Sequence, residues 1–413
     1  MFSSSRSKIF LVVFVSCSLV AEFVILYYFF ILVPKKPPLK PLKKYLIEVQ
    51  KDKVPEFTFS HKELGELKEA FQREEEFLSQ KITYERKLSF GEGKLSPFLV
   101  KESAQLLLKT LQEAKTEEEL NRLIKKRFLI YQAAGEGGEV LFTAYYAPVC
   151  EGSLIREGSY QYPLYLRPEE LKVANLGEFK SSLEGEEIVY RIDTSRGEIV
   201  PYWSRENIVK DEVLEGKNLE FIYLKDRLDR FYLMIEGSGK INLNNGETFR
   251  VRYSASNGRV YSSLSRLLVK EGEIPEDKLS MESIREYFQH HPRRMDQYLN
   301  QNERFIFFTR DEEIKGTIGA GGCELTPKRS IAIDKKIFPL GAVAYIEYPE
   351  PEINREDEIV SIKKKGRFVF CQDTGGVIKG PGRVDIYFGE GEEALAKAGH
   401  LKGKGRLYFL IKK

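Results

Sequence analysis

The sequence predicts a mainly β protein that begins with helices and is preceded by a single transmembrane helix. Three observations support this prediction: one long apolar segment at the N-terminus, a charged stretch of helical periodicity up to about residue 130, and many short β-branched and aromatic segments after residue 137. Gly and Pro turns separate these short segments, a pattern typical of one or two β-barrels.

Composition and charge exclude several classes of protein. The 413 residues include 65 basic and 62 acidic side chains, 32 Gly, 17 Pro and 4 Cys. These values exclude collagen-like, disulfide-dense and wholly disordered chains. Residues 1–44 hold seven basic side chains and one acid, so the net charge of +3 divides into +6 there and −3 in the remainder. A mildly acidic body argues against nucleic acid as a partner.

The first element is an apolar run from Ile9 to Val33, interrupted by Glu22. It is long enough to span a bilayer, so residues 1–33 are predicted to form an uncleaved membrane anchor. A cleaved signal peptide fits less well, because its apolar region is shorter and ends in small residues. A lipoprotein signal with Cys17 as the lipidated residue is a third possibility. The Pro- and Lys-rich residues 34–56 then predict an extended spacer.

Amphipathic helices follow from about Phe57 to Ile130, because apolar residues recur there at three- and four-residue spacing. Beyond Gly137, strands are predicted at 140–146, 188–192, 221–224, 231–235, 305–308, 329–333, 342–346, 367–370, 384–388 and 406–411. Asn244-Asn-Gly246 predicts a hairpin between 240–243 and 248–253. Two helices, 263–270 and 280–290, interrupt the strands, and Ser280 caps the second.

The candidates for chemistry are acids, since the four histidines do not support a Ser or Cys nucleophile and no Cys pair has the spacing of a metal site. Asp373 ends an apolar strand before Gly375 and Gly376, and Asp385 interrupts another apolar strand, where an unpaired charge is costly. A turn aspartate and an edge-strand aspartate would explain both without catalysis. An aspartic protease would need a second Asp-Thr-Gly, which the sequence lacks.

The chain resembles the MltA-type membrane-bound lytic murein transglycosylases. Three aspartate motifs carry the resemblance: Asp334 in Ser330-Ile-Ala-Ile-Asp, Gln-Asp373-Thr-Gly-Gly-Val-Ile-Lys-Gly380, and Arg383-Val-Asp385-Ile-Tyr-Phe-Gly389. Further family motifs occur upstream in the same order, at 143–148, 162–165, 204–208, 235–239, 257–261, 280–284 and 302–308. The resemblance covers roughly Phe142 to the C-terminus.

The resemblance implies a double-psi β-barrel with a second β-rich domain inserted into it. On this view, residues 57–147 form a helical region leading into the first part of the barrel, 148–301 form the inserted domain, and 302–413 form the barrel with the catalytic aspartates. The implied reaction cleaves the β-1,4 bond between N-acetylmuramic acid and N-acetylglucosamine in peptidoglycan and leaves 1,6-anhydromuramoyl ends. A single carboxyl group serves first as general acid and then as base, without metal or cofactor.

The resemblance also implies roles for individual residues. Asp385 is the expected acid and base, Asp373 helps to hold the proton on it, and Asp334 is structural. Glu236 stands where the family is expected to have Gln, and it could perturb Asp385 if it faces the cleft. Tyr145, Tyr146, Tyr202 and Trp203 are candidates for packing against sugar rings, with the hydrophobic core as the alternative for each. The predicted substrate contacts are Thr143, Tyr145, Tyr146, Glu236, Gly237, Ser238, Gly375, Gly376 and Lys379.

Two other functions remain open: a non-catalytic murein-binding module, and a two-carboxylate glycoside hydrolase that uses Asp385 and Glu236. A wall substrate places the body of the protein in the periplasm, anchored to the membrane by its N-terminal helix, although the lysines after the span favour the cytoplasm. Glycan strands of peptidoglycan are then the expected partner. Cys150, Cys323 and Cys371 would form at most one disulfide.

Overall fold

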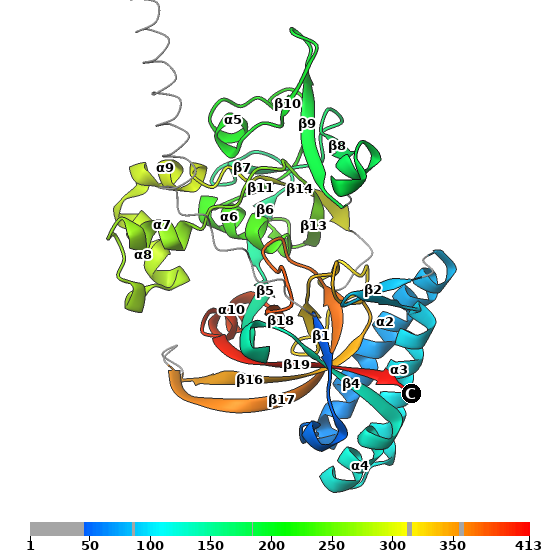
Figure 1. Cartoon of the computed structure of the whole chain (residues 1–413). Helices are drawn as coiled ribbons and strands as arrows, with labels where there is room; N and C mark the ends of the chain where they lie inside the picture. Colours follow the sequence, from blue (N-terminus) through cyan, green and yellow to red (C-terminus); the bar gives the residue numbers. More distant parts are fainter. Residues whose placement is uncertain (1–44, 85–86, 184, 312–315, 355–358) are drawn as a thin grey trace, which may run out of the picture. The chain divides into compact units, whose positions relative to one another are not determined.

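A computed structural model describes residues 45–84, 87–183, 185–311, 316–354 and 359–413 (Figure 1). The predicted anchor, residues 1–33, lies outside the described residues, and among those described no helix is long and apolar enough to cross a membrane. Residues 45–413 form one unit by their contacts. Most of the regular structure is β, as predicted.

Six strands close into a ring in the order β5, β18, β15, β17, β16 and β19, since β19 also pairs with β5. The pairs β5–β18 and β15–β17 are parallel, and the other pairs are antiparallel. The ring therefore joins a strand from before residue 148 to strands from after residue 329. The strands are β5 (Val140–Ala147), β15 (Ser330–Ala332), β16 (Val343–Ile353), β17 (Ile359–Asp373), β18 (Arg383–Glu390) and β19 (Lys402–Lys412).

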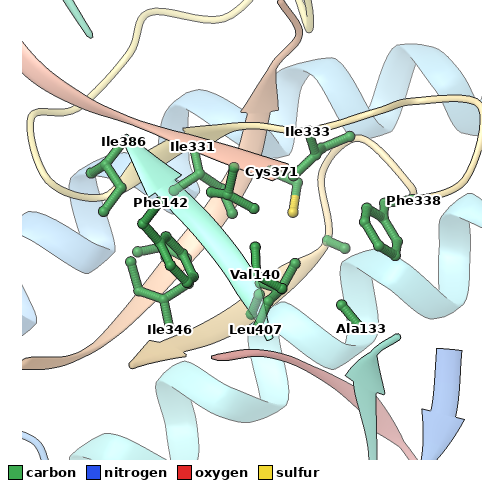
Figure 2. Packing of buried hydrophobic residues seen from close by; sticks show 14 of the residues in the cluster. Ala133, Val140, Phe142, Ile331, Ile333, Phe338, Ile346, Cys371, Ile386 and Leu407 are labelled. Carbon is green, nitrogen blue, oxygen red and sulfur yellow. The ribbon is translucent and has the colours of Figure 1, made fainter. Parts of the chain in front are cut away.

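The interior of the ring is apolar because alternate residues of each strand point inward. Val140 and Phe142 of β5 meet Ile331 of β15, Ile386 of β18 and Leu407 of β19 in one cluster (Figure 2). The cysteines at 150, 323 and 371 are buried and form no disulfide with one another.

The N-terminal helices pack on strands of the ring, with Leu67 and Phe71 of α2 against Phe370 of β17. The helical prediction for this region is confirmed, although it missed the hairpin β2–β3 and strand β4. Strand β1 pairs with β4, so residues 46–48 of the predicted 34–56 spacer are part of the sheet. The elements are β1 (Leu46–Glu48), α2 (Leu64–Tyr84), β2 (Leu88–Phe90), β3 (Gly93–Leu95), α3 (Pro97–Glu113), α4 (Glu117–Arg127) and β4 (Phe128–Ala133).

A second sheet orders its strands β14, β13, β12, β6, β11 and β7, and a smaller one orders them β10, β9 and β8. The predicted hairpin is present as β12 and β13, with Gly246 in the left-handed region (φ 89°). These strands are β6 (Val149–Ser153), β7 (Tyr162–Tyr165), β8 (Lys172–Asn175), β9 (Glu187–Asp193), β10 (Glu198–Pro201), β11 (Glu220–Leu224), β12 (Ser238–Leu243), β13 (Thr248–Ser256) and β14 (Ile306–Asp311).

The strand predicted at 231–235 is wrong, because these residues belong to helix α6. Asp226 caps the helix by accepting from the N–H groups of Leu228 and Asp229, and Gly237 ends it with φ 79°. A helix buried over much of its circumference has a continuous apolar run, which also resembles a buried strand. The remaining helices are α5 (Arg205–Val209), α6 (Arg227–Glu236), α7 (Leu264–Lys270), α8 (Met281–His290), α9 (Met295–Asn300) and α10 (Gly391–Gly399).

Candidate active site

Asp373 and Asp385 flank Ala332 on neighbouring strands of the ring. In the register of β15, Ala332 pairs with Asp373 of β17 on one side and with Asp385 of β18 on the other. Strands lie about 4.8 Å apart, so the two aspartates are separated by roughly 10 Å at the backbone.

Strand alternation places Asp385 on the outer face of the ring. Its neighbours Val384 and Ile386 point into the apolar interior, so the side chain between them points outward. Thr143 is the register partner of Asp385 on β5, and Tyr145 is that of Tyr387. The predicted contacts Thr143 and Tyr145 therefore lie beside the predicted acid.

Asp373 has hydrogen bonds to both of its carboxylate oxygens. The Tyr145 hydroxyl donates to Oδ2 at 2.6 Å, and the N–H groups of Ala320 and Thr374 donate to Oδ1 at 2.8 Å each. Burial raises the pKa of Asp373, while these three donors oppose the rise. Asp373 is thus held rigidly, with both oxygens occupied.

Asp385 has the opposite environment. Its Oδ1 is buried and accepts no hydrogen bond from any described residue. Among the described residues, its ion-pair partner is Arg383, whose Nη2 lies 3.8 Å from Oδ1 and donates to Thr143 Oγ1 at 3.1 Å. Burial raises the pKa of Asp385 to about 6; Arg383 opposes the rise and the charge of Asp373 adds to it. Asp385 therefore changes protonation near neutral pH.

Glu236, at the end of α6, shares the electrostatic environment of Asp385. Burial, and next the charge of Asp385, raise the pKa of Glu236 to about 8. Glu236 is therefore still protonated at the pH where Asp385 ionises. The pKa of buried Tyr146 is raised mainly by burial and next by Glu236. This ring is only 7% exposed and belongs to the core, so the expectation that Tyr146 offers a face to a sugar is not met.

Gly237 and Ser238 connect α6 to β12. Gly237 occupies the left-handed position that ends the helix (φ 79°), and Ser238 begins the strand opposite Arg252. A Cβ at Gly239 would lie 2.8 Å from the carbonyl oxygen of Pro148, so only glycine fits there. Ser238 and Gly239 line a small cavity together with residues 316–318, in the segment that leads to Ala320.

The loop from Thr374 to Gly382 holds the remaining predicted contacts. Gly376 and Lys379 are exposed, and Gly375 is partly buried. Buried Asp334 accepts the N–H of Gly380 at 2.8 Å and so ties the loop to the end of β15. A Cβ at Gly376 would lie 3.7 Å from Nη2 of Arg304.

The two remaining aromatic candidates lie elsewhere. Tyr202 is fully buried and bonds to Glu170, so the prediction of a sugar contact is wrong for it. The guanidinium of Arg191 covers the ring of Trp203 at 3.5 Å from the centroid. Both side chains take the structural role that was the alternative.

Sequence reasoning missed Arg383, Ala332 and Ala320. Arg383 lies two residues before Asp385 on the same strand, and this spacing places both side chains on one face. The N–H of Ala320 reaches Asp373 through a loop, and no sequence signal indicated that contact. Among the described residues, no three His, Cys, Asp or Glu side chains form a cluster that could hold a metal ion.

Comparisons with known proteins identify the family of the chain. The MltA specific insert domain matches residues 141–309, and the 3D domain matches residues 329–411, together more than half of the chain. The chain belongs to the MltA-type lytic transglycosylases. Within this family, it is 28% identical over 319 residues to the membrane-bound lytic murein transglycosylase A homolog of Buchnera aphidicola, covering 76% of this chain and 78% of that protein.

Other MltA relatives are similarly distant. The membrane-bound lytic murein transglycosylase A of Escherichia coli K12 is 28% identical, covering 68% of this chain and 67% of its own length. A crystal structure of a membrane-bound lytic murein transglycosylase from Agrobacterium tumefaciens has a TM-score of 0.69 at 24% identity, covering 89% of this chain and 97% of that one. The E. coli MltA crystal structure with bound chitohexaose has a TM-score of 0.68 at 22% identity, covering 88% and 93%. Both crystal structures share the fold of this chain.

Proposed function

We propose that the chain cleaves the β-1,4 bond between N-acetylmuramic acid and N-acetylglucosamine in peptidoglycan and forms 1,6-anhydromuramoyl ends. The observation that supports this most is the contrast between the two aspartates. Asp385 has an unoccupied oxygen and a pKa raised to about 6, whereas Asp373 is fully hydrogen-bonded. The names of the relatives, and the chitohexaose bound by one of them, support a glycan substrate.

The reaction needs one carboxyl group in two protonation states. Protonated Asp385 donates its proton to the glycosidic oxygen while the bond from C1 to that oxygen breaks, and the leaving sugar departs as an alcohol. The Asp385 carboxylate then takes the proton of the C6 hydroxyl as O6 bonds to C1. A pKa near the working pH suits both steps. The nucleophile is tethered within the substrate, so a second carboxylate is not required.

The neighbouring residues position Asp385 and the sugar. Arg383 stabilises the ionised form of Asp385 after the first transfer, and Asp373 opposes that ionisation. Tyr145 acts through its bond to Asp373 rather than through its ring. Thr143, Ser238 and the exposed loop around Gly376 and Lys379 are the proposed contacts to the glycan, with Gly237 and Gly375 shaping the backbone beside them and Asp334 holding the loop.

The proposal extends to the domain organisation of the chain. We infer that the six-stranded ring is the double-psi barrel, built from residues 57–147 and 302–413, with residues 148–301 inserted.

We also propose that residues 1–33 anchor the protein in the membrane and that the body faces the periplasm. Protease treatment of intact spheroplasts should degrade the body, and protection of the body would contradict this location.

Digestion of purified murein tests the reaction. Wild type should release muropeptides with anhydro ends, which are one water lighter than hydrolysis products by mass spectrometry. Asp385→Asn keeps the shape of the side chain but cannot transfer a proton, so the rate should fall about 100- to 10,000-fold. Asp211→Asn, an exposed aspartate, is the matched control. Full activity of folded Asp385→Asn would contradict Asp385 as the acid, and a folded wild type that binds murein without cleaving it would favour a non-catalytic murein-binding module.

A two-carboxylate hydrolase is the second candidate, because Glu236 and Asp385 interact electrostatically. The pKa of Glu236, raised to about 8, argues against this residue as a base that activates water near neutral pH. Glu236→Gln should therefore retain anhydro products at a rate within about tenfold of wild type, since an essential general base contributes a factor of about 100 or more. Reducing ends as the only products of wild type, together with inactivity of Glu236→Gln, would establish the hydrolase.

A further inference from the structure

A second cavity lies in the part of the chain between residues 156 and 296, apart from the two aspartates. Its volume is about 250 Å³, and Arg227 and Arg230 of α6 line it together with strands β7 and β11. The apolar and aromatic part of its lining consists of Tyr162, Pro163, Tyr165, Val209 and Tyr223. A concave site with an aromatic lining and a few placed charges is typical of a ligand pocket.

Arg230 is the unusual member of this lining. Its side chain belongs to a residue that is 5% exposed, yet within the described residues nothing ion-pairs with its guanidinium or accepts a hydrogen bond from it. Its nearest aromatic partner is Tyr162, whose ring centroid lies 5.7 Å from Cζ. Buried arginines are normally paired. Arg230 therefore offers an unused binding site for a carboxylate.

The other charges of the cavity are divided between paired and free groups. Arg227 is neutralised by Asp296 at 2.7 Å, and Arg156 donates to the side-chain oxygen of Gln161 at 2.9 Å. The remaining lining charges are the carboxylates of Glu212, Glu215 and Glu220, the first two of them exposed. The cavity thus combines a buried cation with acids nearer the solvent.

We propose that this cavity binds the peptide stem of peptidoglycan, with a stem carboxylate on Arg230 and a free ammonium group at the glutamates. A ligand with both charges matches the lining better than an anion or a cation alone. The choice of this ligand rests on the proposed function, since the stem hangs from the muramoyl residue at the cleavage site.

Helix α6 relates the cavity to Glu236. Arg230 and Glu236 are six residues apart on this helix, which is about 9 Å along its axis and about 120° around it. A stem of a few residues in extended form spans about 3.4 Å per residue, a length that exceeds this rise.

Calorimetric titration of the full-length protein tests the proposal. The probe is N-acetyl-L-alanyl-γ-D-glutamyl-meso-diaminopimelic acid, which carries carboxylates and a free ammonium group. Wild type should bind it saturably. Arg230→Gln should weaken binding about tenfold or more, because a hydrogen bond between charged groups is lost. The affinity of Arg230→Lys should lie between those of wild type and Arg230→Gln. Arg293 is exposed and lies outside the cavity, so Arg293→Gln should bind the peptide as wild type does.

A second set of measurements does not depend on the folding of these variants. The same peptide with amidated carboxylates should bind wild type at least about tenfold more weakly. Acetylation of the free amine should also weaken the binding of the peptide to wild type. Glu220→Gln should not weaken the binding of this acetylated peptide any further. Absence of saturable binding to wild type, equal binding of the amidated peptide, or equal binding by a folded Arg230→Gln would overturn the proposal.

The two proposals can fail separately. Cleavage of murein without binding of the peptide would leave the transglycosylase and remove the stem site. Binding of the peptide without any cleavage would leave the cavity as a peptide site and remove the proposed reaction.

Discussion

At the scale of single residues, the site depends on an unequal distribution of hydrogen bonds. Asp373 accepts three, and Asp385 has a buried oxygen that accepts none from the described residues. An unsatisfied buried polar atom costs roughly 1–3 kcal/mol. Such a cost is expected at a functional group whose partner is the substrate.

Arg383 should control the pH at which Asp385 works. In the proposed reaction Asp385 must be protonated to act as an acid, so kcat/KM should decline as the pH rises through its pKa of about 6. The positive charge of Arg383 lowers that pKa, and Arg383→Gln removes it. The alkaline limb of kcat/KM should therefore move to higher pH in this variant.

The control for this prediction is Arg383→Lys, which keeps the charge and should leave the alkaline limb closer to that of wild type. Activity profiles on murein between pH 4 and 9, at constant ionic strength, measure both. An unchanged limb in Arg383→Gln, or a shift to lower pH, would contradict the assigned role.

At the scale of elements, helix α2 brings a carboxyl group into the core behind the site. Glu74 is fully buried, Cys323 donates to its Oε2 at 3.5 Å, and Oε1 has no hydrogen-bond partner among the described residues. Burial raises its pKa to about 7 from an ordinary 4.5. Its contribution to stability is therefore complete below pH 4.5 and is lost as the pH rises to about 7.

Glu74→Gln should remove this dependence. Its free energy of unfolding relative to wild type should rise on the order of 3 kcal/mol between pH 4.5 and pH 8, because wild type must ionise a buried acid and the variant need not. Urea unfolding at both pH values measures the difference. Glu75→Gln, at a partly exposed position on the same helix, is the control and should show a much smaller difference. A difference that does not change with pH would contradict the assignment.

Helix α6 shows what local sequence could and could not predict. The residues 231–235 are apolar throughout, which suggested a strand, while the deciding signals were Asp226 and Gly237 at the two ends. Strands β5, β18 and β19 were predicted because their β-branched and aromatic runs are short and bounded by turns. Asp373 and Asp385 could be chosen from such runs, but the contact of Ala320 with Asp373 depends on tertiary structure alone.

At the scale of the whole molecule, an ion pair joins the second sheet to the ring. Arg250 of β13 makes two bonds to Glu390 of β18, at 2.6 and 3.1 Å, and Thr317 donates to the same carboxylate at 2.9 Å. The Arg250 side chain is only 14% exposed. Because Ser238 and Asp385 lie on the two sheets so joined, this pair helps to hold the proposed glycan contacts in place.

Arg250→Gln should therefore reduce both stability and activity. The expected stability loss is on the order of 1–3 kcal/mol, since Glu390 keeps an uncompensated charge, and kcat/KM should fall about 10- to 100-fold through misplacement of the substrate. Unfolding and murein digestion measure the two effects. Lys225→Gln, which breaks the exposed pair with Glu151, is the control. A fall no larger than in that control would contradict the joining role.

The double variant Arg250→Gln/Glu390→Gln separates charge from geometry. It should regain part of the stability, because no unpaired charge remains, but it should not regain the activity.

The closure of the ring by β5 and β18 also determines when the enzyme comes into being. Thr143 and Asp385 are register partners, yet 242 residues separate them along the chain. At about 5–20 residues per second of synthesis, roughly 12–50 seconds pass between their appearance. Asp385 therefore acquires its buried surroundings only after β18 has been synthesised. A nascent molecule that ends before β18 lacks the proposed acid and its apolar setting, so we expect it to be inactive.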